Sequence, residues 1–107
     1  MILRIENTGP VNIAIPDARI DSMTATSFQE QLVEIIAKSD HVVVDCATVD
    51  YVSSAGLRAL LVAAKAAQSK GMKFAVCSLK PHVKEIFTVS GFDKIVRIDP
   101  DRETALV

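Results

Sequence analysis

One stretch decides the fold: DCATVDYVSSAGLRALL, residues 45–61. Directly before this stretch, the apolar run Val42–Val44 predicts a buried β-strand. The polar residues that follow predict a loop. Ser53 and Ser54 then stand directly before an alanine-rich segment with helical periodicity. Hydroxyls at a helix start can cap its free N–H groups, and the same groups and the helix dipole favour a phosphate. Both roles are open at this point, and neither excludes the other.

Gly56 follows two residues after Ser54. The pair Ala55-Gly56 is a poor choice for helix propensity alone. A glycine removes a side chain, so it lets a partner backbone or an incoming phosphate approach the chain closely. We therefore expect Gly56 to allow such a close approach by a partner backbone or a phosphate.

The N-terminal side of this stretch predicts a hairpin and a helix. Residues 1–6 and 11–15 have the apolar content of two short strands, joined by the turn signal Asn7-Thr8-Gly9-Pro10. After Asp21-Ser22, an amphipathic helix is predicted by its apolar spacing, Phe28, Leu32, Ile35 and Ile36. Its capping box would be Thr26 with Gln29 or Ser27 with Glu30, and Ser39-Asp40 would end it.

The C-terminal side predicts alternating helices and strands. A strand over 41–45 is apolar on both faces, as expected of a central strand. A helix over 55–70, with Gly71 as its C-terminal stop, would bury one stripe: Leu57, Leu60, Leu61, Ala64 and Ala67. A strand over 72–76 follows, then a helix that begins at Pro81, ends at Gly91 and buries Val83, Ile86, Phe87 and Val89. A strand over 94–98 and a short helix after Asp99-Pro100, containing Ala105 and Leu106, complete the chain.

The element order β-β-α-β-α-β-α-β-α implies βαβ crossovers. We therefore expect an α/β fold, a single domain over residues 1–107. Its mixed, mostly parallel sheet has four to five strands, with about four helices and an antiparallel N-terminal β-hairpin at one edge. No internal repeat, low-complexity segment or linker interrupts the 107 residues.

Composition narrows the function. Half of the residues are hydrophobic and 23% are charged, which indicates a folded globular domain. The net charge is −1, so a nucleic-acid or acidic-membrane surface is not expected. The basic residues near the C-terminus predict a mixed charged surface and not a patch: Lys80, Lys84, Lys94, Arg97 and Arg102. No apolar run approaches the roughly 20 residues that a membrane span needs, so no membrane insertion is expected.

The cysteines and histidines predict neither a disulfide framework nor a metal site. Cys46 and Cys77 each adjoin an apolar run, which is typical of small buried core residues. With His41 and His82 they do not form a zinc set. The unpaired cysteines indicate a reducing compartment, and no signal peptide is recognisable, so we expect a cytoplasmic protein. We expect neither a metal nor another cofactor.

Three acids are candidates for chemistry. Asp21, Asp45 and Asp50 fall at predicted element ends, and loops after parallel strands gather at one sheet edge. Asp45 is expected to share an edge with Ser54, and Asp21 to join them. Caps and turns are the alternative, which we favour for Asp50. An acid pair could also hold magnesium or act as a phospho-aspartate receiver, but Pro16-Asp17-Ala18 and Ile95-Val96-Arg97 do not supply the receiver pattern.

Catalytic motifs are not found. Ser53-Ser54-Ala55-Gly56 lacks the Gly-x-Ser-x-Gly nucleophile elbow, and no phosphate-binding glycine loop occurs. Neither His41 nor His82 has an evident acid partner for a triad. We therefore expect a protein that is not an enzyme.

Four segments, in order, resemble the STAS domains of small bacterial anti-sigma factor antagonists. Residues 18–21 resemble the family's G-x-L-D, with Ala18 in place of glycine, and residues 42–45 resemble its third strand. Residues 52–57 resemble its x-D-S-[ST]-G-L phosphorylation loop, and residues 90–95 its S-G-L-x-K-[IL] segment. The resemblance spans essentially the whole chain and implies a STAS fold.

The resemblance also implies a function and a site. The phosphoacceptor serine falls on Ser54, while Ser53 stands in place of the family's Asp and Ala55 in place of its second Ser or Thr. The neighbours Asp21, Asp50, Gly56 and Arg58 would complete the phosphorylation loop or contact the partner. In such proteins the unphosphorylated form binds an anti-sigma factor that is also a serine kinase. Phosphorylation ends the complex, and a serine phosphatase resets the switch that controls transcription or a related signal.

Two other functions remain open for the same fold. One is a constitutive STAS subunit of a lipid-transport ABC complex, in which the hydroxyls at the helix start would be contacts and not switches. The other is a nucleotide or small-molecule sensor that uses the same loop edge.

Overall fold

The computed structural model describes residues 1–107. It contains a mixed five-stranded sheet with strand order β1-β2-β4-β6-β7, whose strands are β1 (Arg4–Thr8), β2 (Val11–Ile15), β4 (His41–Asp45), β6 (Lys73–Cys77) and β7 (Arg97–Asp99). Only the β1–β2 pair is antiparallel, and the other neighbours are parallel. The predicted α/β fold, with a mostly parallel sheet and an N-terminal hairpin at its edge, is confirmed.

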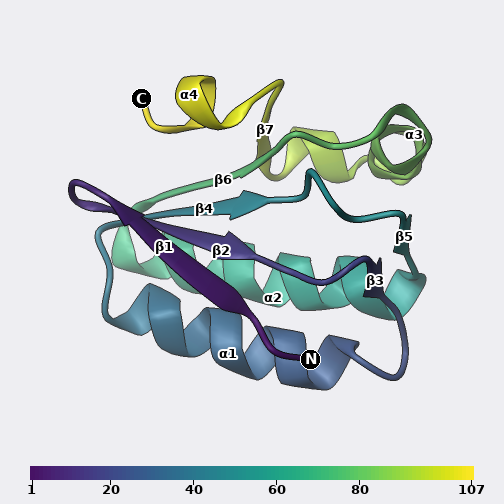
Figure 1. Ribbon diagram of the computed structural model, residues 1–107, viewed down its shortest axis with the longest axis horizontal. Coiled ribbons are helices and arrows are strands. Elements are labelled where there is room, and N and C mark those ends of the chain that lie inside the picture. The colour runs from purple at the N-terminus through teal and green to yellow at the C-terminus, as the bar shows by residue number, and fades with distance from the viewer.

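Four α-helices accompany the sheet: α1 (Ala25–Ala37), α2 (Ser54–Lys70), α3 (Pro81–Val89) and α4 (Arg102–Ala105). Figure 1 shows α1 and α2 side by side on one face of the sheet, with the short α4 on the opposite face. α3 lies toward the end of the sheet where β5 (Tyr51–Val52) is found. The sheet is therefore a middle layer, with two long helices on one side and one short helix on the other.

The predicted double-sided burial of the central strand is confirmed. All five residues of β4 are buried, and the strand alternates between two apolar clusters. Val42 and Val44 face the larger cluster, which includes Phe28, Leu32, Leu60, Val76 and Phe87. Val43 faces the smaller one, with Val11, Ile13, Ile15, Ala75, Cys77 and Ala105. This alternation follows from the period of two along a β-strand.

Both cysteines are buried and unpaired, as predicted. Cys46 belongs to the larger cluster and Cys77 to the smaller one. Burial raises the pKa of the Cys77 thiol to about 11, and it also raises that of Cys46. Both thiols therefore stay protonated at neutral pH and behave as small apolar core groups.

The glycine and proline signals mark helix ends as predicted. Gly71 caps α2 with φ of 68° and Gly91 follows α3 with φ of 77°, both in the left-handed region that glycine adopts without strain. Pro81 occupies the first turn of α3. A backbone N–H in the first turn of a helix has no partner within the helix, so a proline, which lacks this group, is tolerated there.

The first strand begins later than predicted. Residues 1–3 do not belong to β1, because they bond to α1: the Met1 carbonyl accepts from Gln31 Nε2 at 2.7 Å, and Leu3 N–H donates to Gln31 Oε1 at 3.2 Å. Leu3 is buried in the larger cluster, while every residue of β1 is exposed. The N-terminal segment is thus held by a helix before the strand starts.

The predicted strand over 94–98 is wrong in its first half. Residues Phe92–Lys94 form a 3₁₀ turn, Ile95 is 61% exposed, and β7 starts only at Arg97. Phe92 packs edge-to-face on Phe87 with ring centroids 5.3 Å apart, which turns the chain back toward α3. Val89 was expected inside, but it is 81% exposed. The apolar stripe of α3 is therefore limited to Val83 and Phe87, with Ile86 at its border.

Two further strands were not predicted. β3 (Arg19–Ile20) and β5 pair in parallel as a separate two-stranded sheet, with Arg19 opposite Tyr51 and Ile20 opposite Val52. Each strand has only two residues, which is too short for an alternating pattern. This small sheet holds the loop before α1 beside the loop before α2, and so it positions the candidate site.

Candidate functional site at the start of helix α2

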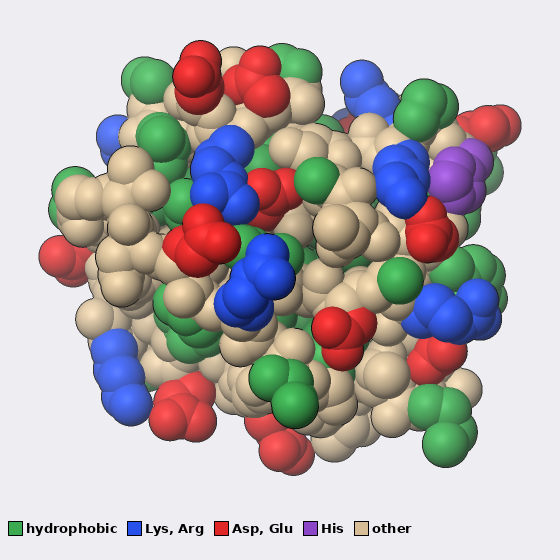
Figure 2. All heavy atoms as spheres, viewed as in Figure 1, with side chains coloured by type: hydrophobic (Ala, Val, Ile, Leu, Met, Phe, Trp, Pro, Cys, Tyr) green, Lys and Arg blue, Asp and Glu red, His purple; other side chains and the backbone are tan.

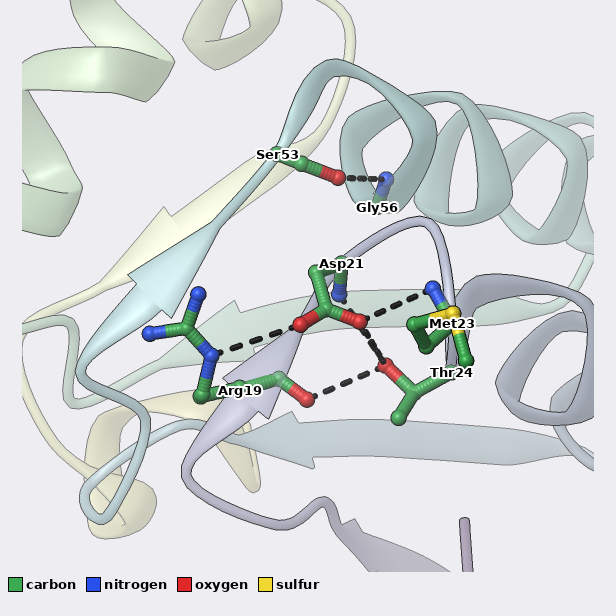
Figure 3. Close-up of polar contacts among 6 residues, drawn as sticks. All are labelled: Arg19, Asp21, Met23, Thr24, Ser53 and Gly56. Atoms are coloured by element: carbon green, nitrogen blue, oxygen red, sulfur yellow. Dashed lines mark hydrogen bonds and ion pairs between the residues drawn. The ribbon is translucent and has the colours of Figure 1, made fainter.

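The β3–β5 pairing continues into the residues that begin α2. Ser53 N–H donates to the Ile20 carbonyl at 2.9 Å, and Asp50 N–H donates to the Ala18 carbonyl at 2.7 Å. Asp21 comes directly after Ile20, so it lies beside the segment that leads to α2, as Figure 3 shows. The expected proximity of Asp21 to the two serines therefore follows from these backbone bonds.

The two serines have different structural roles. Ser53 is the N-cap of α2, with extended backbone, and its Oγ accepts from Gly56 N–H at 3.2 Å. Ser54 is the first residue of the helix, and it is exposed. The cap is thus provided by Ser53, and no hydrogen bond within the chain engages the Ser54 hydroxyl.

Gly56 has a different role from the expected one. It is buried, and a Cβ placed on it would lie 2.5 Å from the Ile20 carbonyl oxygen and 3.0 Å from Val52 Cγ1. The close approach comes from the chain's own β3–β5 sheet and not from a partner or a phosphate. Gly56 is therefore a packing requirement of the site, because only glycine lets α2 start this close to β3.

Asp21 organises the loop that leads into α1. Its Oδ1 accepts from Met23 N–H at 2.9 Å, and its Oδ2 lies 3.3 Å from Arg19 Nε (Figure 3). These bonds, above all that from Met23 N–H, lower the pKa of the Asp21 carboxyl. Asp21 therefore carries its negative charge beside the start of α2 at neutral pH.

The capping box predicted for α1 is wrong. The helix begins at Ala25, with Thr24 as its N-cap, and no side chain caps it. The Thr24 hydroxyl instead accepts from Asp21 N–H at 3.0 Å and donates to the Arg19 carbonyl at 3.1 Å. These contacts tie the start of α1 to β3, which is why the helix starts before the predicted boxes.

Three residues of this surface were missed by sequence reasoning. Arg19 lies over the Tyr51 ring, with its guanidinium carbon 4.5 Å from the ring centroid, and Tyr51 is 40% exposed. Met23 is 88% exposed beside Asp21. Arg19 and Tyr51 meet only because β3 pairs with β5, so no local pattern announces them.

Asp50 is linked to α3. Its carboxylate forms an ion pair with Lys80, and its carbonyl bonds to His82 Nε2 at 2.7 Å. The hydrogen bond from Lys80 lowers the pKa of the Asp50 carboxyl. Asp50 therefore caps no helix. It lies directly before β5 and connects this part of the chain to the start of α3.

The expected participation of Asp45 is wrong. Asp45 ends β4, but its Oδ2 bonds to Arg102 Nε at 2.9 Å and to Arg102 Nη2 at 2.8 Å. Arg102 belongs to α4 on the other face of the sheet, and it also bonds to Glu6 at 2.8 Å. The Asp45 carboxylate is thus used to hold α4 and not to face the serines.

The remaining predicted residues lie on the first turns of α2. Ala55 is half-buried and Arg58 is exposed, and no acid of the chain pairs with Arg58. In an α-helix, residues four apart lie on the same face, so Arg58 follows Ser54 along the helix surface. An exposed hydroxyl and an exposed guanidinium are therefore neighbours there.

Charges elsewhere are mixed in sign, as predicted. Lys80, Arg97 and Arg102 form ion pairs with Asp50, Asp99 and Glu6, respectively. Figure 2 shows acidic and basic side chains interspersed over the face it presents. No group of His, Cys, Asp and Glu side chains is arranged to hold a metal ion. None of the helices combines the length and the apolar character of a membrane-spanning segment.

Comparison with known proteins gives a consistent result. The family model described as the STAS domain matches residues 3–105. The Bordetella bronchiseptica protein BtrV, named provisionally as an anti-sigma factor antagonist, is 35% identical over 106 residues, which cover 98% of this chain and 91% of BtrV.

Solved structures share the fold. An anti-sigma factor antagonist from Mycobacterium paratuberculosis superposes with a TM-score of 0.86 at 23% identity, covering 98% of this chain and 90% of that one. The antagonist SpoIIAA in its unphosphorylated form superposes with a TM-score of 0.78 at 12% identity, covering 96% and 92% of the two chains. The match across nearly the whole length of both BtrV and this chain, together with the shared fold, shows that the protein belongs to the STAS domain family of anti-sigma factor antagonists.

Proposed function

We propose that this protein is a partner-switching regulator whose switch is Ser54. With Ser54 unphosphorylated it binds an anti-sigma factor that is also a serine kinase, and phosphorylation of Ser54 releases that partner. The observation that carries the proposal is that the two serines at the start of α2 have different structural roles. Ser53 provides the cap, which leaves the exposed Ser54 hydroxyl available to a kinase.

The surroundings of Ser54 explain how a phosphate would change binding. The free N–H groups at the start of α2 favour an anion, so the phosphorylated chain keeps its fold. A phosphate adds a charge of roughly −1.5 to −2 at neutral pH. In a complex this charge would have to lose water beside the ionised Asp21, whose pKa is lowered by its hydrogen bond from Met23 N–H. A cost of about 3 kcal/mol would weaken the complex roughly a hundredfold.

The exposed residues around Ser54 suit a docking surface. Met23 offers an apolar side chain, Tyr51 an aromatic ring held under Arg19, and Arg58 a free guanidinium. Exposed aromatic and Met side chains and arginines are enriched where proteins bind each other. A partner that covers Ser54 would contact these residues as well.

The relatives support this mechanism. SpoIIAA is known in an unphosphorylated and in a phosphorylated form, and both superpose on this chain, with TM-scores of 0.78 and 0.72. We extend the same reversible modification to this protein, with a serine phosphatase resetting the switch. The protein would act in the cytoplasm, without catalytic activity of its own, on transcription or a related signal.

A pull-down with three forms of the protein tests the proposal: wild type, Ser54→Ala and Ser54→Asp. We expect a serine kinase of the anti-sigma type to be retained by wild type and Ser54→Ala and lost from Ser54→Asp. The retained kinase, given ATP, should then transfer phosphate to wild type and not to Ser54→Ala, as mapped by tandem mass spectrometry.

The control variant is Thr88→Asp, which adds the same charge at an exposed position of α3. It should retain the kinase like wild type. Retention of the same partner by all three Ser54 forms would refute the switch. Retention of a transporter ATPase by all three would favour the constitutive subunit instead.

A further inference from the structure

The outer edge of strand β1 is open. β1 is the first strand in the sheet order β1-β2-β4-β6-β7, so only one of its sides is paired. All five of its residues are exposed, including Ile5 at 38%, and Ile2 just before it is 84% exposed. The opposite edge strand, β7, has only three residues. An open strand edge is a template for pairing with another strand.

The hairpin determines which backbone groups of β1 point outward. Thr8 pairs with Val11 across the two-residue loop Gly9-Pro10, so this pair closes the hairpin with hydrogen bonds. Hydrogen-bonded and non-bonded pairs alternate along an antiparallel ladder. Arg4 and Glu6 therefore bond to β2, while Ile5 and Asn7 turn their N–H and C=O groups toward the open edge.

We propose that β1 pairs antiparallel with β1 of a second copy of this chain, about a two-fold axis at Ile5. In this register the two Ile5 residues exchange their outward N–H and C=O bonds. Arg4 of each copy then stands opposite Glu6 of the other. The two sheets become one continuous ten-stranded sheet, because each copy contributes five strands.

Charge selects this register from its neighbours. Moving the axis by one residue toward the loop places Glu6 opposite Glu6, and moving it the other way places Arg4 opposite Arg4. Like charges directly opposite each other in a sheet are destabilising, and unlike charges stabilise the pair. Of the registers closest to Ile5, only the one centred on it joins opposite charges.

The environment of these side chains supports the pairing. The Arg4 side chain is 70% exposed, and its only ion pair, to Glu6 of its own strand, is long at 3.8 Å. Glu6 is already oriented by Arg102 at 2.8 Å. A second copy would bring an additional arginine to this fixed carboxylate. On the other face of the strand, the exposed Ile5 side chains would cover each other.

Sedimentation velocity from micromolar to millimolar protein tests the proposal. We expect a reversible dimer for wild type. Ile5→Pro should abolish it, because proline removes the outward N–H and leaves the bonds to β2 intact. Arg4→Glu creates two like-charge pairs, related by symmetry, and should lower the association constant about tenfold.

The single charge variants depend on the register, and mixing them tests the charge pairing between the two β1 strands. Arg4→Glu and Glu6→Lys should each dimerise poorly alone, but an equal mixture should form a heterodimer, because every cross-strand pair then joins opposite charges. Val89→Glu, which alters an exposed apolar residue on α3, away from β1, should leave the dimer unchanged. Circular dichroism checks that each variant is folded.

Three results would overturn the proposal. One is a wild-type protein that stays monomeric up to millimolar concentration. Another is a dimer that persists in both Ile5→Pro and Arg4→Glu, since such a dimer must use another surface. A mixture of the two charge variants that fails to form the heterodimer would exclude the register centred on Ile5.

Discussion

The carbonyl oxygen of Ile20 occupies the space where a side chain of Gly56 would begin. A Cβ on Gly56 would lie 2.5 Å from that oxygen. The same oxygen accepts the Ser53 N–H at 2.9 Å. One carbonyl of β3 therefore fixes both the last residue before α2 and the closest approach of the helix, and thereby the position of Ser54.

We expect Gly56→Ala to destabilise the protein although alanine is the better helix former. Helix propensity favours alanine by about 1 kcal/mol, but the new methyl meets a backbone atom that no side-chain rotation can move. Overpacking of this kind costs about 1–3 kcal/mol. Urea unfolding should show a net loss of stability, whereas Gln68→Ala, at an exposed position of α2, should change it by less than about 0.5 kcal/mol. A more stable Gly56→Ala variant would show that β3 can move away from α2.

Ser53 and Ser54 should differ in their effect on stability. Ser53→Ala removes the cap of α2 and should cost about 1 kcal/mol, which lowers Tm by about 4–8 °C in a domain of this size. Ser54→Ala removes an exposed hydroxyl with no partner in the chain and should change stability by less than about 0.5 kcal/mol. Thermal unfolding of both variants checks this. Equal losses would mean that the two hydroxyls share the cap.

The larger elements could be predicted because their signals are local. The apolar run of β4, the amphipathic spacing of α1, and the residues Pro81, Gly71 and Gly91 each depend on their own neighbourhood in the sequence. The order of these elements then implies a parallel sheet through the handedness of βαβ crossovers. The presence of a serine cap for α2 was likewise visible in the sequence.

The features that could not be predicted from the sequence depend on contacts between segments far apart in the chain. β3 and β5 are two residues long and exist because residues 19–20 and 51–52 pair with each other. The role of Gly56 depends on the same pairing. Asp45 was placed at the right end of its strand, but its partner Arg102 lies 57 residues further along the chain. Periodicity and spacing carry no information about such pairs.

Lys70 joins the two long helices at their C-terminal ends. Its Nζ donates to the carbonyls of Ile36 at 2.8 Å, Ala37 at 3.1 Å and Ser39 at 2.8 Å. The first two of these carbonyls belong to the last turn of α1 and the third follows it, at a helix end where a cation is favourable. We expect Lys70→Met to lower the free energy of unfolding by about 1–2 kcal/mol.

Lys65→Met is the matched control for this change. Lys65 lies on α2 and is exposed, without a hydrogen bond to α1. Its substitution should alter stability by less than about 0.5 kcal/mol. Chemical denaturation of the two variants under the same conditions separates them. Indistinguishable curves would mean that water replaces the Lys70 contacts without loss.

His41 is a buried titratable group of β4. Its Nε2 lies 3.1 Å from the Ala105 carbonyl of α4, on the same side as Lys73 and Arg97, whose side chains bond to Val107 and Thr104. Burial lowers the pKa of His41 below the 6.5 of a free imidazole. The hydrogen bond to the Ala105 carbonyl opposes this shift in part, and the positive charges of Lys73 and Arg97 add to it. The folded protein therefore binds this proton less readily than the unfolded chain.

This difference makes stability depend on pH. Above pH 6.5 both states hold a neutral imidazole, and as pH falls below 6.5 the unfolded chain takes up the proton first. Stability is therefore lost as pH falls from 6.5 toward the lower pKa of the folded state. The carboxyls of Asp21 and Asp50, whose pKa values are also lowered, lose their contribution only as pH falls below 3.8. We expect urea unfolding of wild type to show a decline from neutral to mildly acidic pH that His41→Gln lacks and that His82→Gln, on the exposed surface of α3, retains. A decline of equal size in His41→Gln would assign it to other groups.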